Sequence, residues 1–144
     1  KSSTSRASSP GNRFMPGKRP MSTMHPIMVF NKKDELFLIT GSPGGSQIPA
    51  ANLRVVTGII DFDLLIGDAT MLPRIHKDWP YEDFEFESTL SQDNLNILDK
   101  MGHRLKPSDT IGSTQSIQII DGINYGFADL RRPNSGVSVE KSSQ

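Results

Sequence analysis

Two short apolar blocks separated by a polar turn begin the patterned part of the chain. PIMVF (26–30) and LFLIT (36–40) flank NKKDE (31–35), and this pattern predicts a β-hairpin. The second block runs directly into the Gly-rich segment GSPGGSQIP (41–49). The sequence therefore predicts a strand that ends in a tight, glycine-rich turn.

Helical spacing of apolar residues begins after this turn. It predicts a long helix over about 46–62, with a break near Gly58 allowed and with Asn52 lying mostly off the apolar stripe. The residues of the stripe are Ala50, Leu53, Val56, Ile60 and Leu64. A second, short helix is expected over 66–73, where Pro73 ends it.

The segment after these helices predicts a loop, a strand and a third helix. We expect the loop over 74–83 and the strand at FEFE (84–87), whose alternation indicates a solvated acidic face. Ser91 then caps a helix within 90–102, which ends at Gly102.

Strands account for most of the remaining sequence. HRLKP (103–107) predicts a short strand, and SIQIID (116–121) and INYGFAD (123–129) predict two strands that meet at Asp121-Gly122 in a hairpin. The order of hairpin, helices, strand, helix and strands indicates an α+β or layered α/β fold with an antiparallel sheet.

Composition divides the chain into a body and two polar ends. Residues 1–12 predict a disordered lead-in or linker, residues 13–133 a domain, and residues 134–144 a polar tail. Sixteen Lys and Arg balance sixteen Asp and Glu without a basic stripe, which argues against nucleic acid as a partner. The three His show no metal-ligand spacing and Cys is absent, so no metal site is predicted.

The segment GSPGGS (41–46) is the first candidate site. Its glycines expose backbone N–H groups where a helix begins, and such donors suit a phosphate or the oxyanion of a tetrahedral intermediate. The GK[ST] ending of a Walker A loop is absent, so no lysine is placed for a phosphate. A tight strand-to-helix turn without a ligand explains the same residues.

Adjacent hydroxyl groups at Ser22 and Thr23 form the second candidate site. Both lie in MSTM (21–24), and neighbouring hydroxyls on an extended loop can donate to one carboxylate. On the residues alone, ordinary surface hydroxyls in a turn remain the better interpretation.

Taken together, six segments resemble gamma-glutamyltranspeptidases in their order and approximate spacing. They are PGKRPMSTM (16–24), GSPGGSQI (41–48), MLPRIHKDW (71–79), LSQDNLNILDKMGH (90–103), GSTQSI (112–117) and YGFADLRRP (125–133). The resemblance implies the C-terminal part of the small subunit, with a partial four-layer αββα sandwich of the N-terminal-nucleophile hydrolase type. In that family a precursor cleaves itself, and the new N-terminal Thr attacks gamma-glutamyl amides such as glutathione. The gamma-glutamyl group then passes to water, an amino acid or a peptide.

The resemblance also implies roles for the two candidate sites. By motif position, Gly44 and Gly45 match the oxyanion-hole residues, and Ser22 and Thr23 match the pair that holds the alpha-carboxylate of the gamma-glutamyl group. The family pair is usually two serines, and His25-Pro26-Ile27 stands where Ser-Pro-Thr is usual. The family needs no cofactor and no metal.

The nucleophilic Thr of the family lies upstream of the segments that match. Thr4 stands in a different context, so we expect no nucleophile in this chain and no turnover by the chain alone. The implied partners are the large subunit and the N-terminal part of the small subunit. The implied location is periplasmic, secreted or membrane-anchored and outward-facing. A non-catalytic relative that keeps the fold is the first alternative, and a phosphate-binding module is the second.

Overall fold

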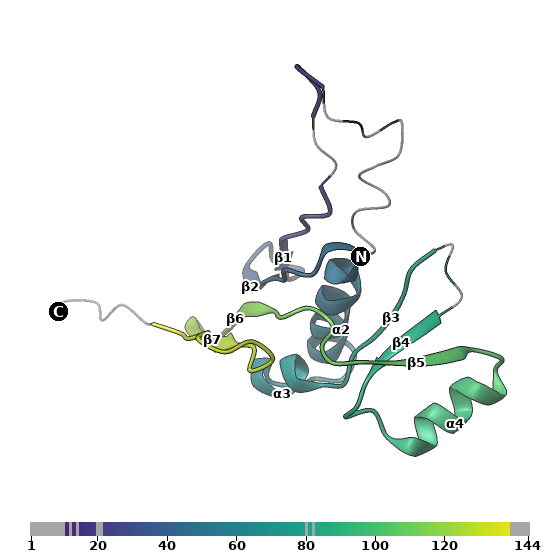
Figure 1. Ribbon diagram of the computed structural model, residues 1–144. Helices are drawn as coiled ribbons and strands as arrows, with labels where there is room; N and C mark the ends of the chain where they lie inside the picture. The colour runs from purple at the N-terminus through teal and green to yellow at the C-terminus, as the bar shows by residue number, and fades with distance from the viewer. Residues whose placement is uncertain are drawn as a thin grey trace.

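The computed structural model describes residues 11, 13, 15–19, 22–79, 81 and 83–138. A four-stranded antiparallel sheet with the order β1-β2-β6-β7 forms its larger half (Figure 1). The strands are β1 (Ile27–Phe30), β2 (Leu36–Gly41), β6 (Gln115–Ile120) and β7 (Ile123–Ala128). Both predicted hairpins are confirmed, and β2 joins them by pairing with β6. Asp121 and Gly122 take positive φ values of 51° and 77° in the second hairpin, as a tight turn between twisted strands requires.

Two helices cover one face of this sheet (Figure 1). A 3-10 turn, η2 (Gly45–Gln47), leads into α2 (Ile48–Ile60), and α3 (Ile66–Met71) follows. The core between helices and sheet consists of Leu38, Val55, Ile59, Ile66 and Ala69. Helix α2 continues through Gly58 without the break that the sequence allowed. This glycine lies where α3 approaches α2 closely. A Cβ at Gly58 would lie 3.0 Å from the Cβ of Ala69.

A three-stranded sheet with the order β3-β4-β5 forms the smaller half. Its elements are β3 (Ile75–Lys77), β4 (Asp83–Glu87), α4 (Gln92–Lys100) and β5 (Arg104–Ser108). The expected loop over 74–83 is wrong at β3, which is too short to show a period and is defined by its pairing with β4. The expected antiparallel sheet is the four-stranded one, whereas β4 and β5 of the smaller sheet are parallel because α4 crosses between them. The cap is confirmed, since Ser91 Oγ accepts a hydrogen bond of 3.3 Å from the N–H of Asn94.

No helix among the described residues is long and apolar enough to cross a bilayer.

The contact between Gly58 and Ala69 yields a stability prediction. Gly58→Ala gains about 1 kcal/mol of helix propensity but forces a methyl group against α3, which costs about 1–3 kcal/mol. We therefore expect a net loss of about 1 kcal/mol in the free energy of unfolding of the complete protein that contains this chain, measured in urea. Adding Ala69→Gly removes the opposing methyl group from α3 and so makes room for the new one on α2. The double variant should therefore lose less unfolding free energy than the sum of the losses in the two single variants. Additive effects would contradict this packing.

Candidate functional site

The glycine-rich turn lies between the end of β2 and the start of α2. Gly44 has φ 142° and Gly45 has φ 60°, conformations that L side chains rarely adopt. In the part of the chain that the structure describes, the N–H groups of both glycines lack a protein acceptor. Open space lies where a Cβ of Gly45 would point, with no atom within 4 Å. The turn thus presents two unpaired backbone donors beside space for a ligand.

A second loop packs against this turn from behind. The Cβ that Gly44 lacks would lie 3.3 Å from the Cα of Gly112, so the two backbones are in close contact. Ser42 Oγ joins the two segments, because it donates to the carbonyl of Pro43 at 2.7 Å and accepts from the N–H of Ser113 at 2.9 Å. The segment around Gly112 therefore fixes the position of the glycine turn.

The smaller sheet also contacts the turn. Gln47, in η2, donates from Nε2 to Glu85 Oε2 on β4 at 3.2 Å. Glu85 in turn accepts from Lys106 Nζ on β5 at 3.2 Å. A polar row from β5 through β4 thus reaches the residues that follow Gly45.

The loop with the two hydroxyls precedes β1. Ser22 Oγ accepts a 3.2 Å hydrogen bond from the N–H of Met24, which leaves the hydroxyl proton of Ser22 available for donation. Ser22 is exposed and Thr23 is half-buried. At the far end of the loop, the carbonyl of His25 accepts a 2.6 Å hydrogen bond from Asn52 Nδ2 on α2.

Strand pairing brings the two candidate segments to the same end of the sheet. Ile27 lies opposite Thr40 in the antiparallel β1–β2 pair. Residues that precede Ile27 therefore leave the sheet at the end where residues that follow Thr40 leave it. The hydroxyl loop and the glycine turn are neighbours at this end, and α2 begins there.

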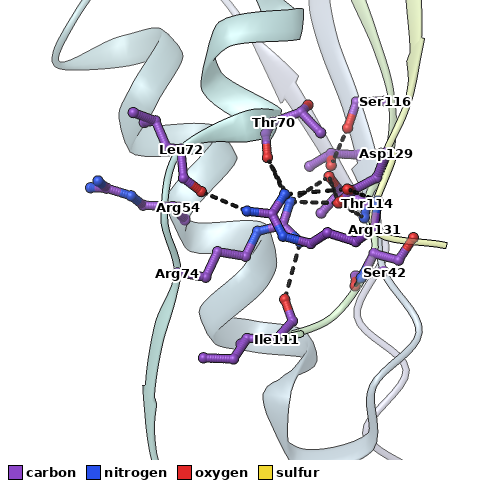
Figure 2. A network of polar contacts seen from close by, with 12 residues as sticks. Ser42, Arg54, Thr70, Leu72, Arg74, Ile111, Thr114, Ser116, Asp129 and Arg131 are labelled. Carbon is purple, nitrogen blue, oxygen red and sulfur yellow. Dashed lines mark hydrogen bonds and ion pairs between the residues drawn. The ribbon is translucent and has the colours of Figure 1, made fainter. Parts of the chain in front are cut away.

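A buried cluster of four charged side chains lies behind the site. Figure 2 shows Arg74 and Arg131 converging on Asp129 and Thr114. Arg74 Nη2 lies 2.7 Å from Asp129 Oδ2, and both side chains are fully buried. Arg131 donates two hydrogen bonds to Glu87, from Nε to Oε1 and from Nη2 to Oε2, each 2.7 Å long. Its Nη1 lies 3.2 Å from Asp129 Oδ1. Two cations and two carboxylates thus neutralise one another inside the protein.

Burial and neighbouring groups shift the pKa values of three members of the cluster. Burial acts to raise the pKa of Asp129, but the N–H of Arg131, the Arg74 guanidinium and the N–H of Thr114 together hold that pKa below its ordinary value. Burial acts to lower the pKa of Arg131, and the carboxylate of Glu87 outweighs it and raises that pKa. Burial and the neighbouring Arg131 lower the pKa of Arg74, although arginine stays protonated.

Backbone hydrogen bonds connect the cluster to the loop behind the glycine turn. Glu87 Oε1 accepts from the N–H of Ile111 at 2.9 Å, and Arg74 Nη1 donates to the carbonyl of Ile111 at 3.0 Å. Asp129 Oδ2 accepts from the N–H of Thr114 at 2.9 Å. These bonds hold both sides of Gly112, and Gly112 contacts Gly44. The cluster therefore supports the glycine turn without facing it.

Sequence patterns did not find the residues that support the glycine turn. The structure places Gly44, Gly45, Ser22 and Thr23 in segments that leave the β1–β2 hairpin at one end, while their roles stay a prediction. The fully solvated acidic face expected for 84–87 is wrong at Glu87, which is 4% exposed and paired with Arg131. Segments distant in the chain supply the partners of Glu87, so strand alternation alone gave no signal of its burial.

Asn52, expected mostly off the apolar stripe of its helix, is fully buried. The expected stripe is wrong, because Leu53 and Ile60 on it are 60% and 49% exposed, while α2 buries the face with Ala51, Asn52 and Val55.

Comparisons with known sequences point in one direction. The family profile described as Gamma-glutamyltranspeptidase matches residues 1–139. The glutathione hydrolase proenzyme of Escherichia coli (strain K12) is 40% identical over 121 residues, which are 83% of this chain and 21% of that protein. The glutathione hydrolase proenzyme of Bacillus subtilis (strain 168) is 33% identical over 131 residues, which are 89% of this chain and 22% of that protein. The chain spans about a fifth of the length of these relatives.

Solved structures show the same fold. A variant of Helicobacter pylori gamma-glutamyltranspeptidase superposes with a TM-score of 0.80 at 32% identity, over 86% of this chain and 69% of that chain. A cephalosporin acylase from Bacillus halodurans superposes with a TM-score of 0.81 at 25% identity, over 92% of this chain and 25% of that chain. The predicted α+β class and the partial sandwich of the N-terminal-nucleophile hydrolase type are therefore confirmed.

The lowered pKa of Asp129 yields a prediction on acid stability. Because this pKa is lower in the folded state, the carboxylate stabilises the fold above its unfolded pKa of about 3.9, and this contribution is lost as the pH falls through the folded pKa. Asp129→Asn should therefore flatten the fall in unfolding free energy below about pH 4. It should also cost about 3–5 kcal/mol at pH 7, because Arg74 is left without its buried partner.

Chemical denaturation of the complete protein at a series of pH values measures both effects. Asp121→Asn is the matched control, because Asp121 lies in an exposed hairpin turn and Asn tolerates the same positive φ. The control should keep the acid slope of the parent protein. An unchanged slope in Asp129→Asn would show that the cluster does not titrate with folding.

Proposed function

Because this chain belongs to the gamma-glutamyltranspeptidase family, we propose that it supplies the oxyanion hole and the alpha-carboxylate clamp of an acyl-transfer enzyme. The substrates of that enzyme are gamma-glutamyl amides such as glutathione, and the acceptors are water, amino acids or peptides. The observation that carries the proposal is the meeting of two different donor sets at one end of the β1–β2 hairpin. One set consists of backbone N–H groups, and the other consists of side-chain hydroxyls.

The backbone donors of Gly44 and Gly45 suit the charge that develops during acyl transfer. Attack on an amide carbonyl places negative charge on its oxygen, and fixed N–H groups stabilise that charge without reorganising. Both N–H groups are free of protein acceptors among the described residues, and the positive φ values fix their directions. One such donor typically contributes about 10²–10³ in rate.

The hydroxyl donors of Ser22 and Thr23 suit the far end of the same substrate. The carboxylate of a gamma-glutamyl group lies at the opposite end of a short chain from the carbonyl that reacts. Ser22 receives a hydrogen bond from the N–H of Met24, so its own proton is directed away from the backbone. The clamp and the oxyanion hole thereby bind the two ends of one gamma-glutamyl unit.

The remaining parts of the catalytic machinery are assigned to other sequence of the same precursor. We place the attacking N-terminal Thr, the rest of the small subunit and the large subunit there. The sheet face opposite α2 and α3 supports a further layer, because Met28 and Ile117 are 64% and 39% exposed on it. Exposed apolar side chains on a sheet face are typical of an interface.

A gamma-glutamyl anilide assay on the complete processed protein tests this proposal. We expect release of the aniline, and a rise in KM of about 10- to 100-fold when Ser22→Ala and Thr23→Val remove two hydrogen bonds to a charged group. Ser88→Ala, at an exposed serine in a turn, is the control and should leave KM unchanged. Absence of aniline release by the parent protein would instead favour a non-catalytic relative that keeps the fold.

The contact between Gly44 and Gly112 gives a sharper test of the oxyanion turn. A Cβ at Gly112 would lie 2.6 Å from Ser42 Oγ and 2.7 Å from the Cβ of Ala51, so Gly112→Ala must displace the turn. We expect kcat to fall by about 10²–10³, with a smaller change in KM, because the turn acts on the transition state. Gly122→Ala is matched in its positive φ but meets no atom within 4 Å, and it should keep kcat. Equal losses in both variants would contradict a special role for the turn.

A further inference from the structure

The side chain of Asn52 on α2 forms a hydrogen bond to the loop that precedes β1. Neither the backbone of α2 nor the sheet needs this bond. Asn52 is fully buried on α2, and its Nδ2 donates to the carbonyl of His25 at 2.6 Å. A carbonyl group only accepts hydrogen bonds, so the amide nitrogen must face His25 and the amide oxygen must face away. The orientation of this side chain is therefore fixed by the loop it binds.

This burial is unfavourable for the helix alone. Oδ1 of Asn52 is buried without a hydrogen-bond partner among the described residues. Its helix neighbours Ala51 and Val55 are fully buried, so the position would accept an apolar side chain. A buried amide with an unpaired oxygen lowers stability relative to such a side chain. The hydrogen bond to the carbonyl of His25 is the one favourable polar interaction that the Asn52 amide makes among the described residues.

That bond is the connection between the hydroxyl loop and the helices. Ser22 and Met24 are bonded to each other, and β1 begins only at Ile27. Within the described part of the chain, the bond from Asn52 is the one side-chain hydrogen bond that joins 22–26 to another element. The position of Ser22 and Thr23 over the site therefore depends on this amide.

The same helix continues from the glycine turn. Gly45 begins η2, η2 leads directly into α2, and Asn52 lies on α2. A helix is a rigid element, so it fixes the distance between the turn at its start and a side chain one turn further on. Asn52 thus connects the hydroxyl loop to the helix whose start carries the oxyanion donors.

We propose that Asn52 is a positioning residue that sets the spacing between the carboxylate clamp and the oxyanion turn. Through that spacing it determines how strongly the enzyme prefers donors with an alpha-carboxylate. This inference rests on the proposed function of Ser22 and Thr23. It assigns Asn52 no contact with the substrate.

The test compares two donors in the complete processed protein. One is a gamma-glutamyl anilide, and the other is the 4-aminobutyryl anilide, which keeps the amide and the amino group but lacks the alpha-carboxylate. The readout is the ratio of the two kcat/KM values. Asn52→Leu, nearly the same in shape, should lower this ratio by about five- to tenfold through loss of preference for the carboxylate. An unchanged ratio in a folded Asn52→Leu protein would overturn the proposal.

Gln118→Met is the matched control for loss of a buried amide. Gln118 is 8% exposed, and its Oε1 accepts from the N–H of Ile66 at 2.8 Å, at the start of α3. The control should lose stability but keep the donor ratio. An equal fall of the ratio in Gln118→Met would show a general loss of stability and would overturn the proposal.

Two further variants keep the outcome interpretable. Asn52→Asp retains the shape but, as a carboxylate, has no proton to donate, so it should lower the ratio as Asn52→Leu does. A normal ratio in Asn52→Asp would overturn the proposal even if Asn52→Leu failed to fold. The double variant Ser22→Ala, Thr23→Val separates failure of the proposed carboxylate clamp from failure of the proposed role of Asn52. If that variant keeps the parent ratio, the clamp itself is wrong, whereas a low ratio there with a normal ratio in Asn52→Leu refutes only the role of Asn52.

Discussion

The ion pair between Arg74 and Asp129 is the interaction on which the rest of the structure depends. Both side chains are fully buried 2.7 Å apart, and neither charge is tolerable there without the other. Arg131 and Glu87 extend the pair to a neutral group of four charges. Their hydrogen bonds reach the end of α3, the start of β3, the end of β4 and the loop before β6. The two sheets are thereby held to one another through charge.

This arrangement places the buried charge cluster, which holds the surrounding loops, apart from the glycine turn, which is open to a ligand. The cluster holds Ile111 and Thr114, and the intervening Gly112 packs on Gly44. The charges themselves stay buried, so they act on the glycine turn through backbone contacts. The two glycines at positive φ give the turn its shape, and the packing of Gly112 against Gly44 holds the turn in place.

The fold follows from local patterns, whereas the support of the site does not. Alternation and turn chemistry predicted both hairpins, and Ser91 predicted a helix start, because these signals lie within a few residues of each other. Glu87 lies in a strand whose alternation predicted a solvated face, and its partner Arg131 lies 44 residues away. Helical spacing predicts an apolar stripe through Leu53 and Ile60 and so places Asn52 off it, but both of these side chains are exposed and α2 buries the face that carries Asn52. Pairing between distant residues is decided by tertiary structure, and single-residue patterns carry no trace of it.

The position of Arg131 along the chain also sets an order of events during synthesis. The glycine turn at 41–45 leaves the ribosome before the segments that support it, together with β2 and the start of α2. The residues that fix its support, Asp129 and Arg131, emerge only after both sheets have been made. Contacts between such distant segments form late, because the intervening chain must first be ordered. A nascent chain that has emerged only to Gly112 therefore carries every residue of the glycine turn without the means to hold the turn in place.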